Sequence, residues 1–226
     1  YRKWPQEYGG FSTLPESRRQ EILELVFGPD GPRPALLKMF LDPYHEPVND
    51  NADPHKTDAA KFDHQTTTAW MRYFVREGLK KTRARGGDLT IITTLYGPPA
   101  WMTRQKFVRG RDLDPAMKEE LAEYLIAWTR YLREEEKFPV RYVSLHNEGE
   151  DFSRWPTDGS WGGYARHDFN MYWHNTQVTD FLRFLRPMMD RAGLKDVGLA
   201  PGETSQWERF INWGYAWGIY NDPEAM

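Results

Sequence analysis

Residues 140–150 read VRYVSLHNEGE, a short β-branched and aromatic run that ends in an amide and a carboxylate. A long amphipathic helical pattern precedes this run, so it predicts a parallel strand that delivers Asn147 and Glu148 to its own carboxyl end. In β/α folds that end of a strand is where ligands bind and chemistry occurs. A carboxyl group there can protonate a glycosidic oxygen, and an amide can hold a sugar hydroxyl. Because most strand-end glutamates are simply solvated, residues 140–150 alone leave the function open.

A second strand end lies in residues 89–103, LTIITTLYGPPAWMT. Residues 89–95 are apolar and β-branched, which predicts a buried parallel strand. The sequence Gly97-Pro98-Pro99 stops this strand, because proline lacks an N–H and fixes its own φ angle. Trp101 follows the stiff turn and either offers a flat platform for a sugar ring or fills a gap in the core.

The two stretches together resemble glycoside hydrolase family 30, whose members are retaining glycosidases on eight-fold β/α barrels. Residues 97–102 match the Ser/Gly-Pro-Pro-x-Trp-Met motif at the end of the family's third strand. Asn147 and Glu148 match the Asn-Glu-Pro motif at the end of its fourth strand, with Gly149 in place of proline. The expected second strand, residues 35–41, lacks the family's arginine-containing pattern, which leaves the subfamily and the substrate open.

The resemblance covers roughly residues 7–202 and implies that Glu148 is the general acid/base and that Asn147 positions the hydroxyl beside the anomeric carbon. The other candidates for substrate binding are Asp42, His45, Tyr96, Trp101, His146, Trp155, Trp161 and Glu203. A retaining mechanism needs a second carboxylate about 5 Å from the first as the nucleophile. In the family this nucleophile lies on the seventh strand, which we expect after Met226.

Several of these candidates have an alternative structural interpretation. His146 either hydrogen-bonds a sugar or packs behind Glu148. Trp155 and Trp161, in the Gly- and Pro-rich loop 152–163, are either binding platforms or loop anchors. Glu203 either faces the same rim as Glu148 or serves as a capping residue. Glu150, a second carboxylate beside Glu148, either has no role in the site or is a neighbouring charge that tunes it.

Residues 42–64 form a polar loop rich in aspartate and histidine after the second expected strand. Asp42 and His45 lie nearest that strand, and an acidic residue occurs in the corresponding loop of the family. The loop either covers the sugar site or binds a metal, although its spacing matches no EF-hand or HExxH motif. A metal-dependent hydrolase on an open α/β sheet is therefore one alternative function, and a non-catalytic carbohydrate-binding barrel is another.

Composition narrows the class of protein. The chain has 226 residues and a net charge of −3, so nothing indicates a nucleic-acid partner. It has no cysteine, no stretch apolar enough to span a membrane, and no nucleotide-binding motif. We therefore expect no cofactor and no metal. The expected partner is an oligosaccharide, polysaccharide or glycoconjugate substrate, and the expected location is secreted or periplasmic.

The chain alternates strands and helices. Strands are expected over residues 8–12, 35–41, 89–95, 140–145 and 197–200, and helices over 15–27, 66–82, 115–136, 168–191 and 210–220. The last four strands start 54, 51 and 57 residues apart, so eight such units need roughly 400 residues. Residues 1–226 are thus expected to form about the first five units of a β/α barrel, with a doubly wound open sheet as the alternative.

Overall fold

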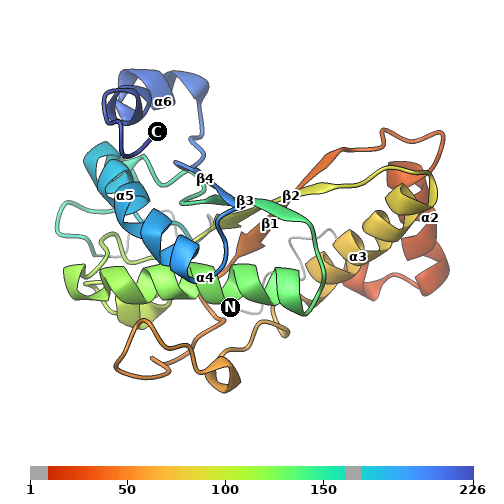
Figure 1. Ribbon diagram of the computed structural model, residues 1–226, viewed down its shortest axis with the longest axis horizontal. Helices are drawn as coiled ribbons and strands as arrows, with labels where there is room; N and C mark the ends of the chain where they lie inside the picture. The colour runs from red at the N-terminus through yellow and green to blue at the C-terminus, as the bar shows by residue number, and fades with distance from the viewer. Residues whose placement is uncertain (1–9, 161–168) are drawn as a thin grey trace.

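The computed structural model describes residues 10–160 and 169–226, and a parallel sheet lies at their centre (Figure 1). Its strands are β1 (Leu36–Leu41), β2 (Thr90–Leu95), β3 (Val140–Ser144) and β4 (Gly198–Ala200). They lie side by side in the order β1-β2-β3-β4, and every pair is parallel. The four corresponding predictions are confirmed to within one residue at each end, because each apolar run is short and ends at a polar or turn residue.

Helices alternate with the strands. They are α2 (Glu16–Phe27), α3 (Ala69–Ala84), α4 (Lys118–Glu134), α5 (Asn175–Arg191), α6 (Trp207–Asn212) and α7 (Tyr215–Tyr220). Single 3-10 turns occupy Phe11–Thr13, Ala59–Lys61, Ala100–Met102, Pro115–Met117 and Phe152–Arg154. No helix within residues 10–160 and 169–226 is both long enough and apolar enough to cross a membrane.

Helix α4 shows how local sequence sets an element. The Asp114 carboxylate accepts a hydrogen bond from the backbone N–H of Ala116, and Pro115 occupies the first position of the 3-10 turn that leads into the helix. Trp128 then lies on the buried stripe, and its indole N–H donates to the Thr93 hydroxyl of β2 at 2.7 Å. The helix is therefore fixed to the sheet by a polar contact as well as by apolar packing.

Three predicted elements differ from the structure. The strand over residues 8–12 is wrong at Phe11 and Ser12, which lie in a 3-10 turn, while residues 8 and 9 lie outside the described residues. The helix expected over 168–191 begins only at Asn175, and the described residues 169–174 that precede it are not helical. The single helix over 210–220 is two short helices, separated where Gly214 adopts a φ of 83° that other residues adopt at a cost.

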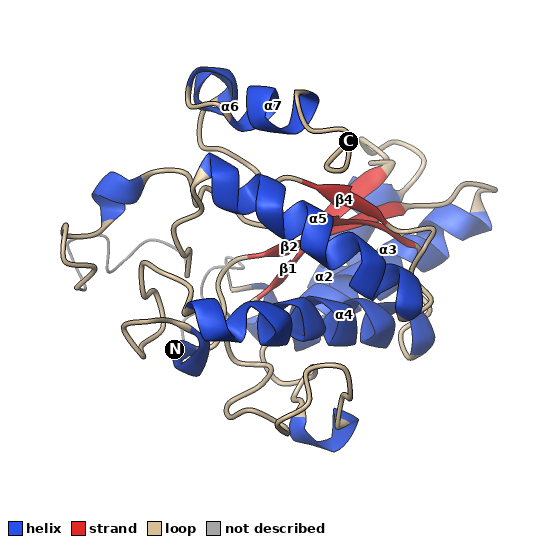
Figure 2. Ribbon diagram, turned by 60° about the vertical axis from the view of Figure 1, so that its left-hand side comes forward, coloured by secondary structure: helices blue, strands red, loops and turns tan. Residues whose placement is uncertain are grey.

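The strand order distinguishes between the two predicted architectures. A doubly wound sheet reverses its strand order at a switch point, whereas a barrel adds each new strand at the same edge. The described strands follow one another without reversal. Helix α2 packs beside α3 and helix α4 beside α5 (Figures 1 and 2), and α4 also contacts β3 and bonds β2 through Trp128.

The strand register assigns side chains to two faces. The row Met39, Thr93 and Val143 faces the helices, because Thr93 bonds Trp128 of α4. The neighbouring row Lys38, Ile92 and Tyr142 therefore faces the opposite side, where Tyr142 is 46% exposed. The candidate site lies on the side of this second face, at the carboxyl ends of the strands.

Candidate functional site

Backbone pairing continues past the ends of β3 and β4. Asn147 and Glu203 form an isolated parallel bridge. The Glu203 N–H donates to the His146 carbonyl at 2.8 Å, and the Glu148 N–H donates to the Glu203 carbonyl at 2.5 Å. These bonds fix Asn147 and Glu148 beside Glu203 at the carboxyl edge of the sheet.

Side chains from β1, from β2 and from the segments that follow β3 and β4 meet at this edge. Lys38 of β1 donates to the Asn147 amide oxygen at 2.6 Å and forms an ion pair with Glu203. The Thr94 hydroxyl of β2 donates to the other oxygen of Glu203 at 2.6 Å. Lys38, Thr94, Asn147 and Glu203 form what we call the strand-end cluster. Its lysine and glutamate are each about one third exposed, so the cluster borders solvent.

Glu148 adjoins this cluster in an unusual backbone conformation. Its φ of 51° lies in the left-handed region, which residues other than glycine enter rarely. The Arg154 guanidinium donates to its carboxylate at 2.9 Å, and that side chain stays 33% exposed. Local backbone strain of this kind occurs often at functional sites, where surrounding contacts hold it in place. The Glu148 carboxylate is therefore held by Arg154 and is still accessible to solvent.

Gly149 occupies the position where the family motif has proline. A β-carbon there would lie 2.6 Å from the Met171 carbonyl oxygen and 2.9 Å from a Trp173 ring carbon. The Gly149 N–H also donates to His146 Nδ1 at 3.1 Å, and proline has no such donor. The departure from the family pattern therefore has a steric reason and a hydrogen-bonding reason.

His146 lies behind the edge of the sheet. It is 2% exposed and stacks on Trp173, with ring centroids 6.1 Å apart. Burial lowers the pKa of His146 to about 4, so the imidazole is neutral at neutral pH. This buried position agrees with packing behind Glu148, which is one of the two interpretations that the sequence leaves open for His146.

Glu150 is enclosed in a separate network. Its carboxylate accepts from the Ser205 N–H at 2.9 Å and the Ser205 hydroxyl at 2.6 Å, and Arg209 lies 3.2 Å away. Burial alone would raise the pKa of Glu150, but the bonds from Ser205 and Arg209 outweigh burial and hold that pKa below its usual value. Glu150 ties the loop after β3 to the start of α6.

Asp42 and His45 lie away from the exposed edge. Both are 0% exposed. Asp42 accepts from the Tyr44 N–H at 2.9 Å, and the His45 ring packs edge-on against Trp128 with centroids 4.7 Å apart. The Nδ1 atom of His45 lies 2.9 Å from that of His64. Both side chains are therefore packed beside α4 in this structure, and their role as substrate contacts stays a prediction.

Tyr96 and Trp101 lie at the ends of β2 and its following turn. The Tyr96 ring packs 4.9 Å from Phe40, with the Lys38 ammonium 5.1 Å from its centroid, so it adjoins the strand-end cluster. Trp101 is half-buried, and its indole N–H donates to the Glu46 carbonyl at 3.0 Å. Trp101 therefore connects the turn after β2 to the loop after β1.

Of the two tryptophans of loop 152–163, the structure describes Trp155 but not Trp161. Trp155 is 8% exposed, and its indole N–H donates to the Arg109 carbonyl at 2.6 Å. This burial matches a loop anchor rather than a binding platform. Trp161 lies outside the described residues.

Three residues that adjoin this edge are not among the candidates predicted from the sequence: Lys38, Thr94 and Arg154. Lys38 could have been noticed in the sequence, because it is the only charged residue in the strand LLKMFL. A buried strand accommodates a lysine only where the ammonium finds partners or water. The sequence around Thr94 and Arg154 has no comparable feature that would have identified them.

Other buried carboxylates lie between loop 42–64 and α4. Burial raises the pKa of Glu46 to about 8 and that of Glu123 to about 7. Asp50, Glu120 and Glu123 are close enough together to hold a metal ion. These groups come from elements other than those that form the strand-end cluster.

Several solved protein structures are similar to the overall fold of this chain. SrfJ from Salmonella typhimurium matches with a TM-score of 0.71 at 16% identity, over 95% of this chain and 45% of that protein. The catalytic domain of GH30 xylanase C from Talaromyces cellulolyticus matches at 0.64 and 16%, over 92% and 48%. The family 30 subfamily 8 xylanase Xyn30A from Clostridium acetobutylicum matches at 0.58 and 20%, over 90% and 42%.

The chain spans about half the length of the solved structures it matches. No protein-family model matches the chain, and no curated protein matches it. At these identities the likeness establishes the fold alone. The chain has the parallel α/β fold of part of a TIM-barrel glycoside hydrolase.

Proposed function

We propose that this chain supplies the general acid/base of a retaining O-glycoside hydrolase, with Glu148 as the reacting group. The observation that supports this most is the position of Glu148 at the carboxyl edge of the sheet, fixed by its N–H bond to the Glu203 carbonyl and one third exposed. A carboxyl group held there can protonate a leaving glycosidic oxygen and then activate water.

Asn147 serves in this proposal as the hydroxyl-positioning residue. The Lys38 ammonium donates to its Oδ1 atom, which fixes which end of the amide carries the oxygen and which carries the NH₂ group. A fixed amide presents a defined donor to a sugar hydroxyl beside the reacting carbon. Tyr96 and Trp101 then supply ring surface near the strand ends.

The nucleophile of the proposed mechanism lies on a segment outside residues 1–226. Glu203 is joined to Glu148 by a backbone hydrogen bond, but Lys38 and Thr94 already hold its side-chain oxygens. We assign Glu203 to the support of the edge and to substrate hydrogen bonding. The substrate class is an oligosaccharide, polysaccharide or glycoconjugate with an O-glycosidic bond.

Substitution of Glu148 in the full-length protein tests the assignment. Glu148→Gln should slow hydrolysis of a substrate with a poor leaving group by about 10²–10⁴-fold, because general-acid help is lost. An activated aryl glycoside needs little protonation and should lose much less in the first step, and azide should partly restore its turnover.

Glu203→Gln is the matched variant. It should weaken substrate binding without azide rescue, because Glu203 is not proposed to form or break the glycosidic bond. Wild-type rates in Glu148→Gln on the poor-leaving-group substrate would refute the proposal. A wild-type protein that binds oligosaccharides but hydrolyses none would indicate a carbohydrate-binding protein instead.

A further inference from the structure

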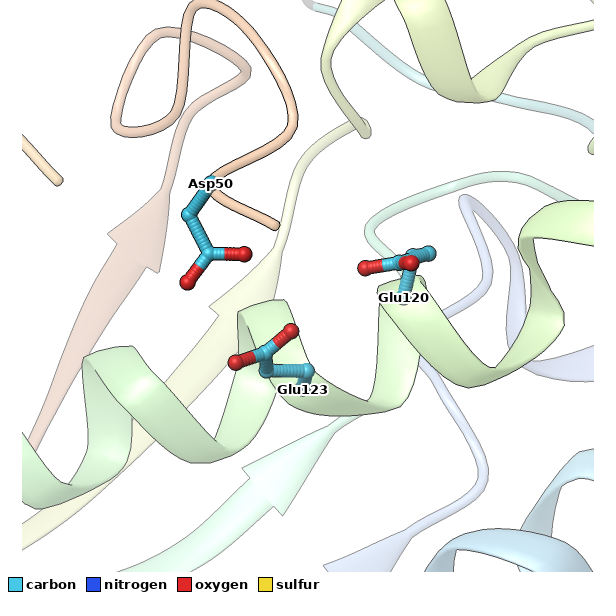
Figure 3. Close-up of side chains that lie close together, drawn as sticks. All are labelled: Asp50, Glu120 and Glu123. Carbon is cyan, nitrogen blue, oxygen red and sulfur yellow. The ribbon is translucent and has the colours of Figure 1, made fainter. Parts of the chain in front are cut away.

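Three carboxylates from distant parts of the chain converge beside α4. Asp50 comes from the loop after β1, and Glu120 and Glu123 lie one turn apart near the start of α4. One oxygen from each can be chosen so that all three lie within 4.8 Å of one another. Figure 3 shows the three carboxylate groups directed toward a common space.

Each of these side chains has an oxygen without a hydrogen-bond partner. The atoms are Asp50 Oδ1, Glu120 Oε2 and Glu123 Oε1, and all three are buried. Glu120 is 7% exposed and Glu123 is 3% exposed. Among the ion pairs of residues 10–160 and 169–226, none involves these three carboxylates. Buried acceptors of this kind are unfavourable unless a proton or a cation satisfies them.

We propose that Asp50, Glu120 and Glu123 bind a hard divalent cation, with Ca²⁺ as the best fit, and that this ion fastens loop 42–64 to α4. Calcium takes six to eight oxygen ligands at about 2.4 Å in a flexible geometry. Two such ligands on opposite sides of the ion are about 4.8 Å apart, and the three oxygens here all lie within that distance of one another. The three side chains supply only oxygen, which disfavours zinc.

Neighbouring hydrogen bonds already orient two of the carboxylates. The Asn49 amide donates to Glu120 Oε1 at 3.1 Å, and the Asp58 N–H donates to Asp50 Oδ2 at 2.5 Å. Each bond engages one oxygen and leaves the other for the ion. Ligand carboxylates in protein metal sites are commonly held in this way by outer partners. Water would complete the coordination.

The proposed ion also affects the loop beyond its ligands. The Asp50 N–H donates to the Glu46 carboxylate at 3.1 Å, and the Glu46 carbonyl accepts the Trp101 indole N–H at 3.0 Å. A cation that fixes Asp50 therefore steadies the segment that holds Trp101. This role is structural, and it does not depend on the proposed glycosidase activity.

Thermal unfolding of the protein, first stripped with EDTA and then titrated with CaCl₂, tests the site. At about 100 times the dissociation constant, one bound ion should raise the melting temperature by roughly 5–10 °C. Calorimetry should give one ion per chain, with weaker binding of Mg²⁺.

Glu123→Gln and, independently, Asp50→Asn should abolish both the binding heat and the temperature shift. Glu119→Gln is the matched control on the same helix, because Glu119 is half exposed and lies 3.6 Å from His55 instead. It should bind Ca²⁺ as the wild type does. The proposal is overturned if the wild type shows no binding heat up to about 10 mM Ca²⁺, or if Glu123→Gln and Asp50→Asn bind it unchanged.

Discussion

At the residue scale, Lys38 explains how the strand-end cluster is held together. A lysine inside an apolar strand loses hydration, and this is compensated only by partners at its ammonium group. Asn147 and Glu203 are such partners, and the Tyr96 ring adds a cation–π contact. One side chain from β1 therefore connects the segments that follow β3 and β4.

Gly149 gives a prediction at the same scale. Gly149→Ala should destabilise the fold by about 1–3 kcal/mol, because the new β-carbon overlaps the Met171 carbonyl and the Trp173 ring. Urea denaturation of both proteins measures the difference in unfolding free energy.

Gly86→Asn is the control for this change. A β-carbon at Gly86 would meet no atom within 4 Å, and asparagine tolerates the φ of 81° found there. This control should change the unfolding free energy by less than about 1 kcal/mol. An unchanged stability of Gly149→Ala would mean that the backbone near Met171 can move aside.

At the element scale, Glu136 joins α3 to the segment after α4. Its carboxylate pairs with Arg72 and with Arg76, the latter at 2.6 Å, and only 8% of its side chain is exposed. Burial would raise the pKa of Glu136, but the bonds from the two arginines outweigh it and hold the pKa below its usual value. Helix α3 and the segment after α4 are therefore connected, and the Arg72–Glu136 pair between them is largely buried.

Glu136→Gln should cost about 3 kcal/mol or more of unfolding free energy, because it leaves the Arg72 charge buried without its partner. Glu134→Gln is the matched control two residues earlier. Its partner Arg130 and Glu134 itself are about half exposed, so the loss there should be below about 1 kcal/mol. Chemical denaturation of both variants provides the comparison, and equal losses would contradict the assigned burial.

At the scale of the whole molecule, burial within the fold changes the titration of His146 and His64. Burial lowers the pKa of His146 to about 4 and that of His64 to about 3, whereas each is near 6.5 in an unfolded chain. Between pH 6.5 and 4 the unfolded chain therefore binds protons that the folded chain does not. The stability from these histidines is complete above pH 6.5 and falls as the pH decreases through this window.

The unfolding free energy measured by urea titration from pH 7 to pH 4 should show this loss. His146→Asn removes one titrating group, so the slope against pH should become shallower by up to about 1.4 kcal/mol per pH unit. Glu46, whose pKa is raised to about 8, acts in the opposite direction in both proteins and cancels in the comparison. Identical slopes would show that His146 is accessible to protons in the folded state.

The sequence by itself determined the local features of this protein. The apolar runs before Tyr96 and His146 are short and end at turn residues, so hydrophobic pattern alone located β2 and β3. Because parallel strands present their carboxyl ends at one edge, the same pattern allowed Glu203 to lie at the rim of Glu148, and the structure pairs Asn147 with Glu203.

Only the tertiary structure decided which polar side chains face each other. Asp42 and His45 follow β1 directly, yet the packing of Trp128 and Tyr124 of α4 buries them completely. Asp50 and Glu120 are 70 positions apart and meet only because α4 packs beside the loop. Periodicity reports whether a residue faces a core, but contacts between distant segments depend on how the helices and loops pack against the sheet.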